Sequence, residues 1–139
     1  MKESAVFPRV REIIDAFGAR LQVSVEAHPT GSLVVFNRPD RPLYPSAMLD
    51  GYGVEVLCGY IMAARLALPN GLPDETVDGP FPARFALARG DQVTLVMQQP
   101  NEHRGFEIPA PFWDRLYAEL CVVIAHSREL SRRTARRLQ

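Results

Sequence analysis

The spacing of hydrophobic residues predicts a helix followed by a β-hairpin in the first part of the chain. Over residues 4–21 apolar side chains recur at intervals of three and four, which is typical of an amphipathic helix. The period then changes to two, because apolar and polar residues alternate over residues 21–27. A turn at residues 29–31 leads into a second predicted strand at residues 32–36, so the two strands are expected to pair.

The same order returns in the rest of the chain. A helix is predicted from Ala47 or Asp50 to Leu68, and a polar loop is expected over residues 71–82. Alternating residues on both sides of Gly90-Asp91 predict a second hairpin with a two-residue turn, in which Gly90 would adopt a positive φ. A short extended piece at residues 106–108 precedes a last helix that begins at residues 109–111.

These elements predict a single α+β domain over residues 1–139, with residues 131–139 frayed. The predicted order is α-ββ-α-ββ-α: an antiparallel sheet from two β-hairpins, packed with three helices on one face. The halves also resemble each other, because residues 34–36, a proline-containing loop and Cys58 parallel residues 95–97, a proline-containing loop and Cys121. We interpret this likeness as two ββα units.

The middle helix is apolar on all sides. Between Val54 and Leu68 the only charged residues are Glu55 and Arg65. A helix of this kind must be buried all round, whereas a helix in a two-layer domain buries only one face. We expect the other face to be covered either by a second copy in a twofold dimer or by a terminal helix of the same chain, with the dimer favoured.

Composition limits the classes of protein to which the chain can belong. The chain is 47% hydrophobic and 23% charged, with a formal net charge of zero, which is typical of a globular protein and favours neither nucleic acid nor a membrane as partner. The longest apolar run has about fifteen residues, fewer than the roughly twenty that span a bilayer. Cys58 and Cys121 lie in apolar runs, so we expect two reduced, buried thiols in a cytoplasmic protein without a signal peptide.

No residue pattern predicts a catalytic or metal site. The histidines His28, His103 and His126 lack metal-binding spacing, and the acidic cluster at residues 74–78 is expected to be a solvated turn. Phosphate-binding glycine loops and nucleophile motifs are absent. We therefore expect a protein that is not an enzyme and that holds neither a cofactor nor a metal.

A basic stripe on the last helix is the clearest charge feature. Arg128, Arg132 and Arg136 recur every four residues. Such a stripe could contact an acidic partner or a nucleic acid, but no aromatic side chains interleave with it as a stacking platform would require. A solvated helix end with favourable cations near its negative dipole remains the simpler interpretation.

The order of predicted elements, together with residues 85–96 and 111–120, resembles the class I type III secretion chaperones of bacteria. The resemblance implies a small cytoplasmic homodimer that holds the N-terminal segment of a client protein in extended form. It also implies that the second helix forms the dimer interface, through Val54, Leu57, Cys58, Ile61 and Met62. The family has a third strand before that helix, whereas prolines interrupt residues 38–46 of this chain.

A client-binding role would require an exposed apolar groove beside a strand. The candidate residues are Val6, Val10 and Phe17 on the first predicted helix and Leu33, Val35 and Phe36 on the second strand, although each could instead belong to the core. Two other hypotheses stay open: a small regulatory or ligand-binding domain without catalysis, and a nucleic-acid-associated protein that uses the arginine stripe.

Overall fold

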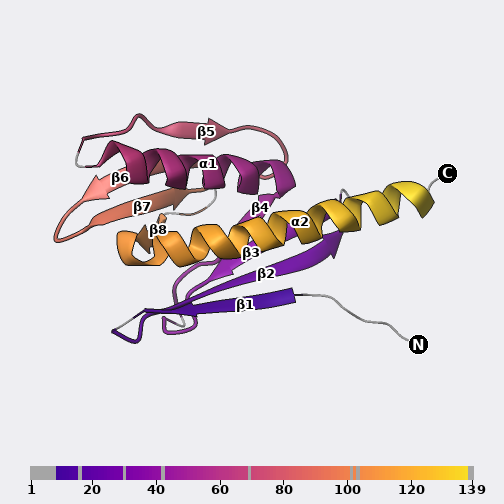
Figure 1. Cartoon of the computed structure of the whole chain (residues 1–139), viewed down its shortest axis with the longest axis horizontal. Coiled ribbons are helices and arrows are strands. Elements are labelled where there is room, and N and C mark those ends of the chain that lie inside the picture. The colour runs from indigo at the N-terminus through magenta and orange to yellow at the C-terminus, as the bar shows by residue number, and fades with distance from the viewer. Residues whose placement is uncertain are drawn as a thin grey trace.

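The fold consists of two successive units, each made of four strands and a helix (Figure 1). It is taken from a computed structural model, which describes residues 9–15, 17–29, 31–41, 43–68, 70–100, 102 and 104–137. The first unit contains β1 (Arg9–Ile14), β2 (Arg20–His28), β3 (Gly31–Asn37), β4 (Ala47–Asp50) and α1 (Gly51–Ala67). The second contains β5 (Glu75–Val77), β6 (Ala83–Arg89), β7 (Val93–Gln98), β8 (Phe106–Pro109), a short 3-10 helix (Ala110–Phe112) and α2 (Trp113–Arg137).

Each unit forms its own antiparallel sheet, and the two helices form one layer across both sheets. The strand orders are β1-β2-β3-β4 and β5-β6-β7-β8 within the described residues. Each helix reaches the sheet of the other unit, because α1 contacts β5 and β6 as well as β3 and β4, whereas α2 contacts β1, β2 and β3. The helices run side by side in opposite directions (Figure 1). The α+β class and the antiparallel pairing predicted from the sequence are thus confirmed.

The two units match position by position on their buried faces. Val23 pairs with Phe36 in the first sheet as Phe85 pairs with Met97 in the second. Along the helices the buried residues Val54, Leu57, Ile61 and Ala64 correspond to Trp113, Leu116, Leu120 and Val123. The predicted ββα repeat is therefore a ββββα repeat. Its helical register differs from the predicted alignment of Cys58 with Cys121, because matching Ile61 with Leu120 aligns Cys121 with Met62.

The predicted first helix is wrong over its described part. Residues 9–14 form strand β1, and β2 begins at Arg20, while residues 1–8 lie outside the described residues. Valine and isoleucine favour strands, and β1 pairs with β2 along its whole length. Among the described apolar residues of the predicted helical stripe, only Ile13 is buried, at 1% exposure, whereas Val10 and Ile14 lie on the opposite face and are about half exposed.

A compact turn replaces the middle of that predicted helix. The Asp15 carboxylate accepts hydrogen bonds from the N–H groups of Phe17 and Ala19, at 2.8 Å each. Gly18 has a φ of 86°, a conformation that L side chains rarely adopt. The three predicted helices are therefore two in the described part of the chain, and the first of the three is replaced by a strand and this turn.

The other predicted elements are mostly confirmed, with differences at their ends. The β2–β3 hairpin, the extended piece at β8 and the start of the last helix agree with the structure. The loop predicted over residues 71–82 contains β5, and β4 precedes α1. The second hairpin has a three-residue loop, because Arg89 pairs with Val93, and Gly90 does not have a positive φ.

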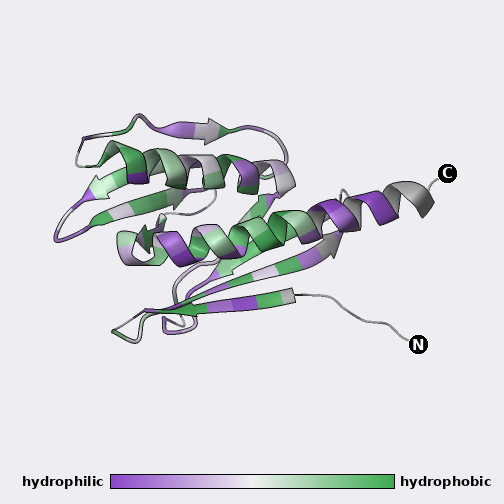
Figure 2. Cartoon of the chain, viewed as in Figure 1, coloured by the Kyte–Doolittle hydropathy of each residue, from purple (hydrophilic) through white to green (hydrophobic). Residues whose placement is uncertain are grey.

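The helices differ in their surface character (Figure 2). Hydrophobic residues extend along most of α1, which begins after Asp50, whose carboxylate accepts a hydrogen bond from the Gly53 N–H at 2.9 Å. By contrast, α2 changes from mixed to hydrophilic towards its C-terminal end. Within the described residues, neither helix has the length and apolar character needed to cross a bilayer.

Candidate functional site

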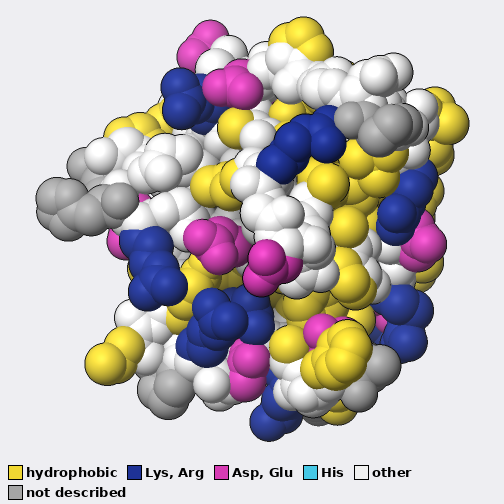
Figure 3. All heavy atoms as spheres, turned by 90° about the vertical axis from the view of Figure 1, so that its left-hand side faces the viewer, with side chains coloured by type: hydrophobic (Ala, Val, Ile, Leu, Met, Phe, Trp, Pro, Cys, Tyr) yellow, Lys and Arg dark blue, Asp and Glu magenta, His cyan; other side chains and the backbone are white. Residues whose placement is uncertain are grey.

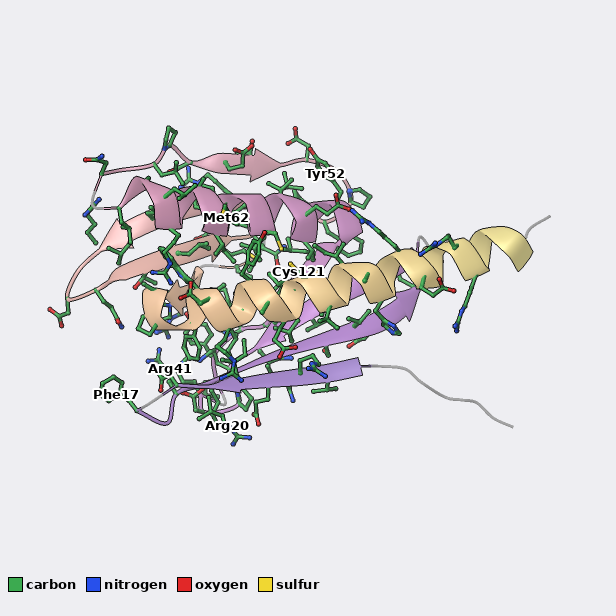
Figure 4. The ribbon with its side chains drawn as sticks, viewed as in Figure 1. Phe17, Arg20, Arg41, Tyr52, Met62 and Cys121 are labelled. Atoms are coloured by element: carbon green, nitrogen blue, oxygen red, sulfur yellow. The ribbon has the colours of Figure 1, made fainter. Side chains whose placement is uncertain are left out.

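The outward side of the helix layer carries an apolar surface, which we call the outer helix face. All its residues are exposed: Tyr52, Gly59, Met62 and Leu66 from α1, and Ala118, Cys121, Val122 and Ala125 from α2. Met62 and Cys121 lie on the facing helices in Figure 4. Leu66 is 77% exposed and Val122 is 49% exposed, so large apolar groups are left in water. The small residues between them would let another surface approach closely.

An ion pair joins the helices at each end of this face. Arg65 of α1 contacts Asp114 of α2 at 2.8 Å, and Glu55 of α1 contacts Arg128 of α2 at 3.4 Å. Glu55 and Asp114 occupy corresponding positions of the two units, and Asp114 lies in the first turn of α2, where a negative charge is favourable with the helix dipole. Both pairs are exposed, so each is expected to contribute little to the stability of the fold.

The residues predicted for a dimer interface separate into two groups. Val54, Leu57, Cys58 and Ile61 are buried inside the subunit, where α1 packs against both sheets and α2. Met62 faces outward and is 44% exposed. The apolar character of α1 is therefore satisfied on most sides by the same chain, and its exposed large apolar residues lie along the outer helix face.

The two cysteines differ in environment, contrary to the expectation that both are buried. Cys58 is 8% exposed, and burial, followed by the nearby Cys121 and Glu55, raises the pKa of its thiol to about 12. Cys121 is exposed because it directly follows the buried Leu120, and one helical step turns it away from the core. Cys58 is thus kept as a neutral thiol, whereas Cys121 belongs to the outer helix face.

A cleft of about 610 Å³, which we call the amphipathic cleft, opens where α1 begins and α2 continues beyond it. Its apolar floor comes from both units: Val34, Val54, Val123 and Ile124. Its rim is polar and consists of Tyr52, Glu55, Arg128 and Arg132 beside Gly51. A smaller cleft of about 270 Å³ lies at the opposite end of the helix pair, between residues 61–65 and Asp114 and Tyr117.

The predicted arginine stripe is partly at this cleft. Arg128 and Arg132 are exposed and line the amphipathic cleft, but neither is without a partner. Arg128 contacts Glu55, and Arg132 contacts Glu129 at 3.4 Å. The side chain of Arg136 lies outside the described part of the structure.

The residues predicted for a client groove do not share one surface. Val10 and Val35 lie in one row across the outward face of the first sheet, but Val35 is 9% exposed. Phe36 points to the opposite, buried face, and Leu33 is also buried. Phe17 is 92% exposed on the β1–β2 loop, apart from the sheet face (Figure 4). Val6 lies outside the described residues.

Sequence reasoning missed a cluster of arginines around Tyr44. The guanidinium groups of Arg38, Arg41 and Arg104 lie 5.9, 5.7 and 4.7 Å from the centre of the Tyr44 ring. The Tyr44 hydroxyl donates to the carbonyl of Gly105 and accepts from the N–H of Glu107. No local signal reveals this cluster, because its members come from loops about sixty residues apart in the sequence.

The Tyr44 cluster ties the two units together. Arginines surround the ring, and Arg38 is itself buried beside Asp40, at 3.0 Å. Gln99 makes a similar link, since its side-chain amide bonds both the N–H and the carbonyl of Met48. Figure 3 views the molecule from the left-hand side of Figure 1 and shows arginines dispersed among hydrophobic and acidic side chains.

The histidine and acidic residues discussed in the sequence analysis do not come together into a site within the described residues. Among the residues that the structure describes, no three histidine, cysteine, aspartate or glutamate side chains gather where they could hold a metal ion. His28 packs edge-on against Phe81, and Asp74 of the acidic loop contacts Arg84 at 3.6 Å. His103 is outside the described residues.

Comparison of the sequence with known protein-family models and with curated proteins found no match.

Proposed function

We propose that this protein is a non-catalytic partner-binding protein that self-associates through the outer helix face. The observation that carries the proposal is the exposure of Tyr52, Met62, Leu66 and Val122 on one side of two adjacent helices. Surfaces of this kind mark sites where another protein binds, because burying exposed apolar area is favourable.

Charge complementarity supports a second copy as the partner. Within the subunit, Glu55 lies level with Arg128, and Arg65 lies level with Asp114. A twofold axis parallel to the helices keeps every residue at the same position along the helix direction, and it sets α1 of one copy against α2 of the other. Acidic residues of each copy would then face arginines of its mate at both ends of the interface.

Shape complementarity points in the same direction. Between the two ion pairs, Gly59 lies approximately level with Val122, and Met62 with Ala118. In the proposed dimer each large side chain would meet a small residue of the partner subunit. Gly59 has open space where a side chain would stand, so it can receive a large group from another surface.

Measurement of molecular mass in solution tests this proposal. Wild-type protein is expected to have twice its chain mass of 15.6 kDa by light scattering. Met62→Lys and Val122→Lys should each give a folded monomer, since a lysine at the centre of the interface would be desolvated without a partner. Leu43→Lys is the matched control: Leu43 is 98% exposed away from the helices, so this variant should remain a dimer. A monomeric wild-type protein at high concentration would refute self-association.

Holding an extended client segment is a second activity that one observation favours. Strand β1 is at the edge of its sheet and exposes Val10 and Ile14, so an extended peptide could add to it as a further strand. By the resemblance to class I type III secretion chaperones, the bound peptide would be the N-terminal segment of a client protein. The structure departs from that resemblance at β1, which stands where the resemblance implies the first helix.

A labelled ten-residue peptide of alternating valine and threonine is a suitable probe for this activity. The fluorescence anisotropy of the peptide should rise when wild-type protein is added. The double variant Val10→Lys/Ile14→Lys, which places charges on the edge strand, should bind the peptide with about tenfold lower affinity. Leu43→Lys again serves as control. Absence of binding would refute the client activity and leave self-association untouched.

A further inference from the structure

We propose that the amphipathic cleft binds a small anion that carries an apolar tail, such as a medium-chain carboxylate. The cleft adjoins the outer helix face, because Tyr52 and the Glu55–Arg128 pair belong to its rim, but its floor lies between the helices and the first sheet. The proposal rests on the combination of an apolar floor, a cationic rim and a volume suited to a small ligand.

The floor would hold the tail. Val34, Val54 and Val123, at 0%, 1% and 2% exposure, close the base of the cleft. The tail would contact mainly the partly exposed Ile124 and the ring of Tyr52, which is 66% exposed. The three valines come from β3, α1 and α2, so the floor is formed by rigid elements of both units. A volume of about 610 Å³ falls within the range of roughly 300–1,000 Å³ typical of small-molecule sites.

The rim would hold the charge of the anion. Arg132 shares the single carboxylate of Glu129 with Arg133, whose contact is 3.2 Å, so one negative charge faces two guanidinium groups. Residues 128–137 contain five arginines and one glutamate. The positive end of the α1 dipole points to the same rim, at Gly51 and Tyr52.

Two carboxylates near the rim determine which arginine an anion could bind first. Asp50 is already engaged as the cap of α1 through the Gly53 N–H. Glu55 occupies Arg128 at 3.4 Å across the cleft opening. A ligand carboxylate would therefore bind Arg132 first and compete with Glu55 for Arg128, which makes Glu55 an internal competitor of the ligand.

Calorimetric titration of the full chain with decanoate, below its micelle-forming concentration, tests the site. Decanoate is expected to bind, whereas decyltrimethylammonium, which has the same tail and the opposite charge, should bind at least tenfold more weakly. Acetate, which has the charge without the tail, should give no measurable binding. Equal binding of the cation and the anion would overturn the proposal, as would absence of decanoate binding.

Matched variants locate the binding. Arg132→Gln should weaken decanoate about tenfold, whereas Arg133→Gln should change its affinity less than twofold, because both arginines contact Glu129 but only Arg132 lines the cleft. Glu55→Gln should tighten binding several-fold by releasing Arg128. Equal losses in the two arginine variants, or weaker binding in Glu55→Gln with an unchanged thermal melt, would overturn the assignment.

Discussion

The two ββββα units share their topology but fill their corresponding positions differently. Val23, Ala47 and Val54 of the first unit correspond to Phe85, Phe106 and Trp113 of the second, and all of them are buried. Small and branched residues in one unit thus stand where the other has aromatic rings. Two of these rings pack against aromatic residues of the first unit, because the Phe106 ring lies 6.2 Å from that of Phe36 and the Phe85 ring lies 6.0 Å from that of Tyr60.

The helices of the two units also start and end differently. A side-chain cap from Asp50 begins α1, whereas the start of α2 is held by the 2.9 Å bond from the Trp113 indole N–H to the carbonyl of Ile108. The 17 residues of α1 stop at the end of the layer, whereas the 25 residues of α2 continue past it with arginines. This difference in length explains why the clefts at the two ends of the helix pair are unequal.

The largest expected effect comes from truncating corresponding core positions. Trp113→Ala should lower the free energy of unfolding by about 3–5 kcal/mol, through the cavity and the unsatisfied Ile108 carbonyl. Val54→Ala at the corresponding position should cost about 2 kcal/mol, because fewer buried carbons are removed. Urea denaturation measures both. Equal losses would show that the two units contribute equally to the core.

The next prediction concerns alkaline pH, and it separates the two cysteines. The pKa of Cys58 is raised to about 12, so the folded state keeps a proton that the unfolded chain releases near its ordinary value of about 8.5. Stability should therefore fall as the pH rises from about 9 towards 12. Burial also raises the pKa values of Tyr44 and Tyr60, which act in the same direction.

Comparison with Cys58→Ala isolates the cysteine contribution, because this variant should lose less stability between pH 9 and pH 11 than the wild type. In the folded monomer of Met62→Lys a thiol reagent should modify Cys121 rapidly and Cys58 only after unfolding, whereas the proposed dimer would protect Cys121 as well. Rapid modification of both thiols in the folded state would contradict the burial of Cys58.

Sequence periodicity predicted the elements whose patterns are unambiguous and failed where two periods compete. The alternation over β2 and the long buried stripe of α2 were sufficient to identify both. In β1, Val10, Ile13 and Ile14 also match helical spacing, and only pairing with β2 decides between the alternatives. The three-residue β5 is too short to carry a periodic signal.

The candidate site was less accessible to sequence reasoning than the fold. The apolar character of α1 did indicate that it is covered on most sides, but the sequence could not show that α2 and both sheets supply most of that cover. The arginine stripe could be predicted from the sequence. The apolar floor of the amphipathic cleft could not, because Val34 and Val123 are separated by almost ninety residues. Such a cleft depends on how α2 crosses the first sheet.

A smaller effect is expected at the starts of the helices. Asp50→Ala should lower the free energy of unfolding by about 1 kcal/mol, since the Gly53 N–H loses its acceptor. Asp78→Ala, an exposed aspartate outside any helix, should change stability by less than about 0.5 kcal/mol. Thermal denaturation of the pair would measure the difference. A negligible effect of Asp50→Ala would indicate that α1, like α2, starts through packing alone.

The smallest expected effects are at the ion pairs that link the helix ends. Asp114→Asn and Glu55→Gln should each cost no more than about 0.5 kcal/mol, because the pairs are exposed and water screens them. The two losses should be similar, and both should vanish in 1 M salt. Similar losses would mean that the two ends of the helix pair differ in the size of their clefts and not in the strength of their ion pairs. A much larger loss in Glu55→Gln would instead make the Glu55–Arg128 pair a structural support of the larger cleft.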